Sequence, residues 1–174
     1  MMRFFFGAPS LALVLLFSTS VHAQGRRFVS VAGGYSVADP PGFRQSPALA
    51  RDGKVDVVWV GPGPSRASVA HVPLSAKISA EQLVTIAREN FLAKEGKTAR
   101  IIKARSVSVG GDQAAIIQGE RTAKARGSIR QSLVSTLILR RGKLYVLGTG
   151  VPVNRPNDGV RLMSTLIGSL KFKN

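Results

Sequence analysis

The chain has 174 residues, a formal net charge of +16 and no cysteine. The lack of cysteine excludes disulfide bonds, thiol redox chemistry and a lipid anchor on a cysteine near a signal sequence. The positive charge favours anionic partners such as phospholipid head groups, lipopolysaccharide or an acidic protein face, although it does not select among them. The alternative is that the charge only keeps the protein soluble.

The first 23 residues have the pattern of a cleavable secretory signal peptide. Arg3 is followed by an apolar run over Leu11–Phe17, which is shorter than the ~20 residues needed to span a bilayer. Small residues at Val21 and Ala23 fit a cleavage site, so we expect cleavage after Ala23. An uncleaved anchor is the alternative. We expect residues 24–174 to form one exported domain, in the periplasm or, in a photosynthetic host, the thylakoid lumen.

Four short strands are predicted in the first part of this domain. Phe28–Val31 and Tyr35–Ala38 flank a glycine turn and are expected to form a hairpin. Two further strands are expected over Val55–Val60 and Ala67–Val72. The Gly-Pro-Gly-Pro segment between them predicts a rigid turn.

A helix follows. Ser79 and Gln82 have the spacing of a capping box, which predicts a helix over Ala80–Glu95. Its expected apolar face repeats every four residues and comprises Leu83, Ala87 and Phe91.

Three longer strands and a fourth, shorter one are expected in the second part of the domain. Their predicted ranges are Ile101–Val109, Gln113–Arg121, Ile129–Leu139 and Leu144–Leu147. The third and fourth of these strands are apolar on both alternations, so we expect them to be covered on both faces. We interpret the next segment, Gly148-Thr149-Gly150, as a turn.

A second helix is predicted to begin at Pro156, with Asn154 as a candidate cap. Its expected buried face comprises Val160, Met163, Ile167 and Leu170. The order of elements predicts an α+β fold, with a central antiparallel β-sheet between helices in a single domain.

The sequence contains few residues that could form a catalytic or metal site. His71 is the one histidine outside the predicted signal, and its apolar neighbours indicate that it packs in a strand. Any Ser-His-Asp set would have to use it. We interpret Asp52 and Asp56 as ordinary surface acids, because they do not form a pair in a hydrophobic pocket pattern that would raise a pKa. We therefore expect no catalytic, metal or cofactor site.

Basic residues gather at two turns, and we expect these turns to bind the partner. The candidate residues are Arg121, Lys124, Arg126 and Arg130 at one turn, and Arg140, Arg141 and Lys143 at the other. One strand separates the turns, so the two clusters should lie about 30 Å apart and cannot form one small-anion pocket. We expect a broad contact, and solvated loop charges are the alternative.

Two segments with distinctive patterns lie on either side of the capped helix. Gly34–Phe43 reads as glycine, an aromatic residue, a short strand and a Pro-x-x-Phe-type stop. Gly142–Leu147 reads as a glycine-lysine hairpin that leads to the final helix, which ends in Ser169–Phe172. In this order the two segments resemble the PsbP-like family, and the resemblance spans nearly the whole mature chain.

The resemblance implies an αβα sandwich and a non-enzymatic role. Photosynthetic members bind the lumenal face of photosystem II, and other branches include envelope proteins and a factor that binds the GTPase Ran. This chain lacks the lipid-attachment cysteine of cyanobacterial members, has a short leader before Phe28, and has Phe43 where tryptophan is commoner. The resemblance therefore carries the fold to this chain and not the photosystem role.

The sequence thus predicts an exported, non-catalytic accessory protein that docks to an acidic protein complex or an anionic envelope surface through its basic loops. Peripheral membrane contact is compatible with this function, and export argues against nucleic acid as a partner. The alternative is a carrier or sensor of a small ligand held between the sheet and a helix, in a cavity lined by Trp59, Phe91 or Met163.

Overall fold

A computed structural model describes residues 26–50, 53, 55–74, 77–123 and 128–173. The predicted signal peptide, residues 1–23, lies outside the described residues. The described elements are β1 Arg27–Ser30, β2 Tyr35–Ala38, β3 Arg44–Gln45, the 3-10 helix Pro47–Leu49, β4 Val57–Val60, β5 Arg66–Pro73, α1 Ala80–Glu95, β6 Ala99–Val109, β7 Asp112–Ala123, β8 Ile129–Arg140, β9 Lys143–Pro152, α2 Pro156–Ser169 and β10 Lys171–Phe172. Neither α-helix in these ranges is long and apolar enough to cross a membrane.

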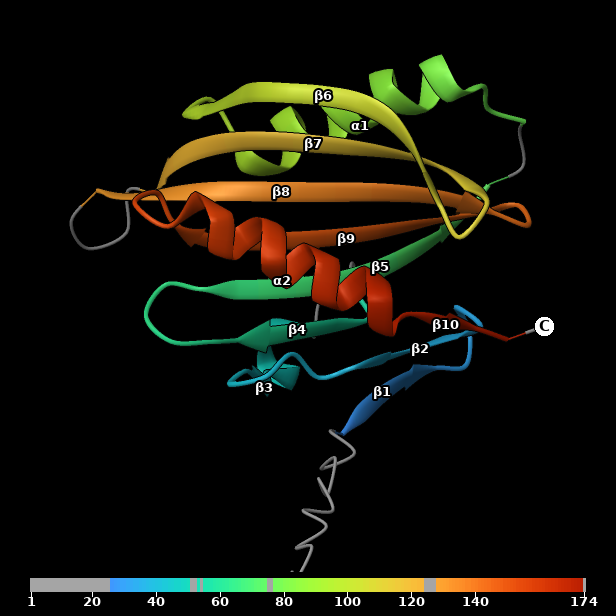
Figure 1. The fold of residues 1–174 in the computed structure, drawn as a ribbon, viewed down its shortest axis with the longest axis horizontal. Helices are drawn as coiled ribbons and strands as arrows, with labels where there is room; N and C mark the ends of the chain where they lie inside the picture. The colour runs from blue at the N-terminus through green and yellow to red at the C-terminus, as the bar shows by residue number, and fades with distance from the viewer. Residues whose placement is uncertain (1–25, 51–52, 54, 75–76, 124–127, 174) are drawn as a thin grey trace, which may run out of the picture.

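The strands form two antiparallel sheets (Figure 1). The larger sheet has the order β3-β4-β5-β9-β8-β7-β6, and the smaller one has the order β1-β2-β10. The predicted α+β class is therefore confirmed, as is the predicted β1–β2 hairpin. The separate small sheet was not predicted, because its third strand is only two residues long.

Helix α1 begins and ends at the predicted residues. The Ser79 hydroxyl accepts a bond from the Gln82 amide, and the Gln82 side chain accepts one from the Ser79 amide, which confirms the capping box. The predicted face is buried and packs on the sheet over β6, β7 and β8.

The two helices pack against alternate side chains of the central strands. Leu133 and Leu137 of β8 share a core cluster with residues of α1, whereas Val134 and Ile138 share the other cluster with residues of α2. Because successive side chains of a strand point to opposite faces, the helices cover opposite faces of the sheet. Figure 1 shows α2 crossing in front of the sheet and α1 behind it. The prediction that the central strands are covered on both faces is confirmed for β8.

The predicted buried face of helix α2 is confirmed in part, because Met163 is buried and both Ile167 and Leu170 are half-buried and pack against the same core. Its buried residues are Gly159, Leu162, Met163 and Leu166, whereas Val160 is 40% exposed. Gly159 faces the sheet, and a Cβ added there would lie 3.2 Å from Val151 Cγ2. The absence of a side chain at Gly159 therefore allows α2 to approach β9 closely. The cap prediction was also wrong, since the N-cap is Arg155 and no side chain caps this helix.

Strand β9 is longer than predicted. Gly148, Thr149 and Gly150 are not a turn, because they lie within β9 and pair with both β5 and β8. Thr149 is buried and its hydroxyl donates a 3.2 Å bond to the Gly159 carbonyl of α2. Gly148 and Gly150 lie on the opposite face of the sheet from the Thr149 side chain, and they leave the backbone uncovered there. That face holds a groove.

Candidate functional site

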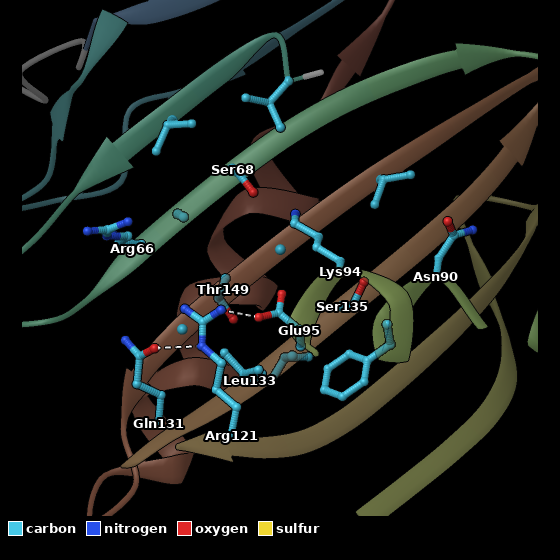
Figure 2. Close-up of a pocket in the computed structure, with 18 of the residues that line it drawn as sticks. Arg66, Ser68, Asn90, Lys94, Glu95, Arg121, Gln131, Leu133, Ser135 and Thr149 are labelled. Carbon is cyan, nitrogen blue, oxygen red and sulfur yellow. Dashed lines mark hydrogen bonds and ion pairs between the residues drawn. The ribbon is translucent and has the colours of Figure 1, made fainter. Parts of the chain in front are cut away.

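A groove opens on the α1 side of the large sheet, beside the helix and over β8, β9 and β5 (Figure 2). Its cavity volume is about 480 Å³, within the range of small-molecule sites. Helix α1 contributes Asn90 and Phe91 to one side, and Val55 and Val58 line the other.

The groove owes its depth to two glycines. Leu144 and Val146 of β9 pack on the α1 side, and alternation places Gly148 and Gly150 on the same side. The neighbouring side chains over them are those of Ser68 and Leu133, each 3.1 Å from the position that a glycine Cβ would take. The middle of the groove floor is therefore backbone, and the side chains of Ser68 on β5 and Leu133 on β8 rise on either side of it.

Basic side chains surround the groove. Figure 2 shows Arg66, Lys94 and Arg121 around it, with Arg121 held by two neighbours. Arg121 is bonded to the Glu95 carboxylate, and its Nε donates a 2.9 Å bond to Gln131 Oε1. Three basic side chains against one carboxylate give the described lining a net charge of +2.

A second basic feature lies on the opposite face of the sheet. Glu120 of β7 accepts bonds of 2.9 Å from Arg100 on β6 and 3.0 Å from Arg130 on β8. The side chains of these arginines are 69% and 57% exposed. The bond from Arg100, together with the second from Arg130, lowers the pKa of Glu120 below its usual value. We name these three residues the Arg-Glu-Arg cluster.

The first predicted basic turn is only partly described. Arg121 faces the groove and Arg130 belongs to the Arg-Glu-Arg cluster, so the two side chains lie on opposite faces of the sheet. Lys124 and Arg126 lie outside the described residues.

The second predicted basic turn lies at the other end of β8. Arg140 is paired with Asp112 at 2.7 Å and lies over the Phe172 ring. Lys143 Nζ donates a 2.8 Å bond to the carbonyl of Ala32. Arg141 is exposed at the tip of the turn, with a φ of 48°. Arg140 and Lys143 therefore hold the C-terminal strand and the β1–β2 turn against the large sheet.

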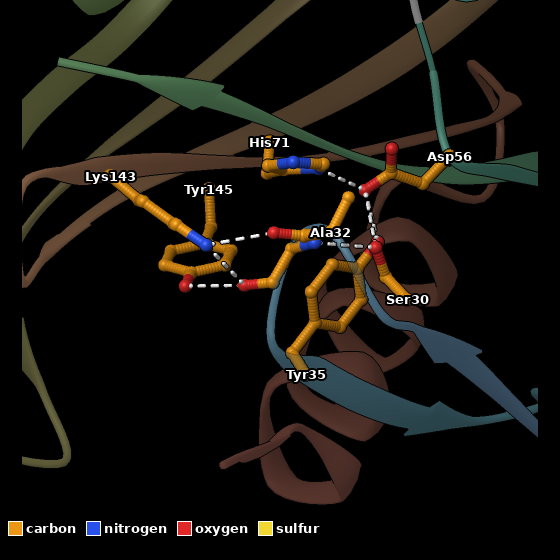
Figure 3. Close-up of polar contacts among 8 residues, drawn as sticks. Ser30, Ala32, Tyr35, Asp56, His71, Lys143 and Tyr145 are labelled. Carbon is orange, nitrogen blue, oxygen red and sulfur yellow. Dashed lines mark hydrogen bonds and ion pairs between the residues drawn. The ribbon is translucent and has the colours of Figure 1, made fainter. Parts of the chain in front are cut away.

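The residues around His71 form a polar cluster that joins the two sheets (Figure 3). Asp56 Oδ2 lies 2.7 Å from His71 Nδ1 and accepts a 2.8 Å bond from the Tyr35 hydroxyl. Burial, followed by the bond to Asp56, raises the pKa of Tyr35 far above its usual value, so the hydroxyl remains a donor. The interpretation of Asp56 as a surface acid was therefore wrong, because β4 and β5 bring it beneath the small sheet.

This cluster does not have the arrangement of a catalytic triad. Ser30 Oγ lies 3.5 Å from Asp56 Oδ2 and accepts a 3.0 Å bond from the Gly33 amide, so the hydroxyl contacts the carboxylate and not the imidazole. Within the described ranges, no group of three or more His, Cys, Asp and Glu side chains is placed to hold a metal ion.

Comparison with known proteins identifies the fold. No protein-family model matches the chain, and no curated protein matches it by sequence. The solution structure of cyanobacterial PsbP (CyanoP) from Synechocystis sp. PCC 6803 is similar over 88% of this chain and 95% of its own, with a TM-score of 0.65 and 18% identity. The chain has the PsbP-like fold.

Two other solved structures share the PsbP-like fold. The Ran-binding protein Mog1p of Saccharomyces cerevisiae is similar over 84% of this chain and 94% of its own, with a TM-score of 0.59 and 10% identity. LpqN of Mycobacterium tuberculosis, described as involved in cell envelope biogenesis, covers 88% of each chain with a TM-score of 0.59 and 11% identity. The resemblance to PsbP-like proteins that the sequence predicted is confirmed in the fold.

The groove of this PsbP-like domain was missed by sequence reasoning. Of the three residues proposed to line a ligand cavity, only Phe91 lines the groove, whereas Trp59 and Met163 lie in the core on the other face. The sequence did contain an indication of the groove. Gly148 and Gly150 are two residues apart, so they share one face if they lie in a strand and leave that face without side chains. Interpreting them as a turn concealed it.

Proposed function

We propose that this domain is an exported, non-catalytic binding protein that docks an acidic protein partner through its basic side chains. The Arg-Glu-Arg cluster carries the proposal. It holds two exposed guanidinium groups in place across three strands, with a single carboxylate between them. Guanidinium groups held in this way are suited to carboxylates, which they bind through two parallel hydrogen bonds.

The remaining basic residues divide by position. Exposed Lys103 and Arg105 extend the basic surface along β6, next to Arg100. We propose that Arg130 contacts the partner together with Lys124 and Arg126 of the same turn, and that Arg141 contributes at the other end of β8. Arg121, Arg140 and Lys143 have internal partners, which are the Glu95 carboxylate, the Asp112 carboxylate and the Ala32 carbonyl, respectively. We further infer that the sheet and its two helices correspond to the αβα sandwich of PsbP-like proteins.

The similar structures support a binding role. Mog1p is named as a Ran-binding protein, and LpqN is described as involved in cell envelope biogenesis. Neither description names a reaction. The observation that distinguishes this chain from a generally basic protein is the fixed geometry of the Arg-Glu-Arg cluster, which random surface lysines lack.

Co-sedimentation with membranes of the host tests the docking proposal. Untreated and protease-stripped membranes are compared across a salt series. The double variant Arg100→Gln/Arg130→Gln is compared with Arg88→Gln/Arg161→Gln, which removes the same charge from exposed positions on the helices. We expect binding to be lost on stripping, to weaken with salt, and to fall about tenfold in the cluster variant only.

Two outcomes would contradict docking to a protein. Binding that survives stripping would indicate lipid or lipopolysaccharide. Equal losses in the two double variants would show that net charge, and not the cluster, attracts the partner.

Export is tested by the mature N-terminus. When the full chain is produced in an exporting bacterial host, we expect the purified protein to begin at Gln24, because Val21 and Ala23 provide the small residues that a signal peptidase requires. Intact-mass and N-terminal sequence analysis measure this directly. Recovery of the protein with Met1 in the cytoplasmic fraction would contradict it.

A further inference from the structure

We propose that the groove beside α1 binds a small anionic amphiphile, with one carboxylate or phosphate head group on an aliphatic chain. The site is distinct from the docking surface, because Glu120 and Arg130 lie on the other face of the sheet. The inference stands on the shape and charge of the groove and does not require the docking proposal.

The positive charge of the groove is concentrated at one end. Strand register places Arg66, Gly150 and Leu133 in one row across the sheet, and Arg121 with Gln131 in the next. Two guanidinium groups therefore lie on either side of the position where Gly150 carries no side chain. Guanidinium groups bind carboxylate and phosphate oxygens with charge-assisted hydrogen bonds.

Charge at this end is not balanced within the described structure. Glu95 is the one described carboxylate in the lining, and it is bonded to Arg121. None of the ion pairs among the described residues includes Arg66 or Lys94. An anionic head group would supply the missing countercharge, and the Lys94 side chain extends over the groove where it can reach one (Figure 2).

The rest of the groove favours a hydrocarbon chain. Beyond Gly150, the next row contains Ser68, Gly148 and Ser135, and the groove then meets Val146. Further apolar lining comes from Leu49, Val55, Val58 and Phe91. A free inorganic anion would leave this lining uncovered, and a neutral apolar molecule would desolvate the cations without pairing them. A molecule with both parts satisfies both regions.

Calorimetry and amide NMR on the purified protein test the inference with four probes. Decanoate and decyl phosphate carry the two head groups, decyl maltoside has the chain without charge, and inorganic phosphate has the charge without the chain. We expect at least one anionic amphiphile to bind, with the largest amide shifts at Gly148 and Gly150. The tighter of the two identifies the head group. The neutral and inorganic probes should bind at least tenfold more weakly.

Variants locate the site. We expect Arg66→Gln/Lys94→Gln to weaken binding of the preferred probe about tenfold or more, and Ser135→Leu to block it by filling the space over Gly148. Arg88→Gln/Arg161→Gln removes the same charge from exposed positions outside the groove and should leave binding unchanged. Because Arg66 and Lys94 are exposed, their variants are expected to fold.

Three results would overturn the inference. One is equal affinity for decanoate, decyl phosphate and decyl maltoside. Another is equal weakening by the two charge variants, which would indicate adsorption to a basic surface. The third is absence of binding of both anionic amphiphiles at millimolar concentration. None of these results bears on the Arg-Glu-Arg cluster, which lies on the other face of the sheet.

Discussion

Tyr35 and Tyr145 are adjacent buried aromatic residues whose hydroxyl groups have different partners. Tyr35 donates to the Asp56 carboxylate at 2.8 Å, whereas Tyr145 donates to the neutral Gly33 carbonyl at 2.9 Å. Their rings meet edge to face, with centroids 5.7 Å apart. Burial raises the pKa of both hydroxyls, so each remains a donor. Both bonds connect the small sheet to the large one.

This pair predicts a difference in stability between two equivalent changes. We expect Tyr35→Phe to lower the free energy of unfolding by about 1.5–3 kcal/mol, because the half-buried Asp56 carboxylate loses a donor. Tyr145→Phe removes a bond to a neutral carbonyl and should cost about 1 kcal/mol. Urea denaturation of both variants measures the difference. Equal costs would show that Asp56 finds another donor when the Tyr35 hydroxyl is removed.

None of these contacts was predictable from sequence. Asp56 and His71 are separated by a turn, and their pairing depends on the register between β4 and β5. The Tyr35 bond depends further on how the small sheet lies against the large one. Sequence patterns report alternation and spacing within a segment, so they place His71 in a strand without revealing its partner.

The two helices differ in how well local sequence determines them. Helix α1 was predicted to the residue because its signals are local, with a capping box at Ser79 and a regular apolar spacing. The face of α2 was predicted only in part, because the face that a helix buries depends on the surface that it meets. A glycine at position 159 allows close packing only because Val151 of the sheet lies opposite it.

Two glycines of α2 should therefore respond in opposite ways to the same change. Around Gly168 an added Cβ would meet nothing within 4 Å, so Gly168→Ala should stabilise the protein by about 0.5–1 kcal/mol through helix propensity. At Gly159 the added methyl would press on Val151, and we expect Gly159→Ala to destabilise despite the same gain in propensity. Thermal unfolding of the two variants provides the comparison. A stabilised Gly159→Ala protein would show that α2 shifts away from the sheet at little cost.

At the scale of the whole molecule, the central and the edge strands differ in how many of their neighbours pair with them. Strands β8 and β9 are each paired with a neighbouring strand on both sides. Both contribute side chains to the core clusters that pack against the helices. Strands β1, β3 and β6 each have one paired neighbour among the described strands. The sequence predicted the central strands from their continuous apolar character, and it did not predict which strands form the edges, because edge position depends on long-range pairing.

Hydrogen exchange should follow this order. We expect amides of β8 and β9 to exchange slowest, close to the rate set by global unfolding, and those of β1, β3 and β6 to exchange fastest. Exchange measured by mass spectrometry resolves these segments. Slow exchange along the unpaired side of β6 would instead indicate that another strand covers it in solution.

The open edge of β6 also affects self-association of the protein. A long unpaired strand is a template for stacking. Here a bulge between Ile101 and Lys103 interrupts the ladder and leaves Ile102 59% exposed. Exposed Arg100, Lys103 and Arg105 give the edge a repulsive charge toward an identical strand. Charges of one sign along this edge therefore oppose edge-to-edge pairing between neighbouring copies of the chain.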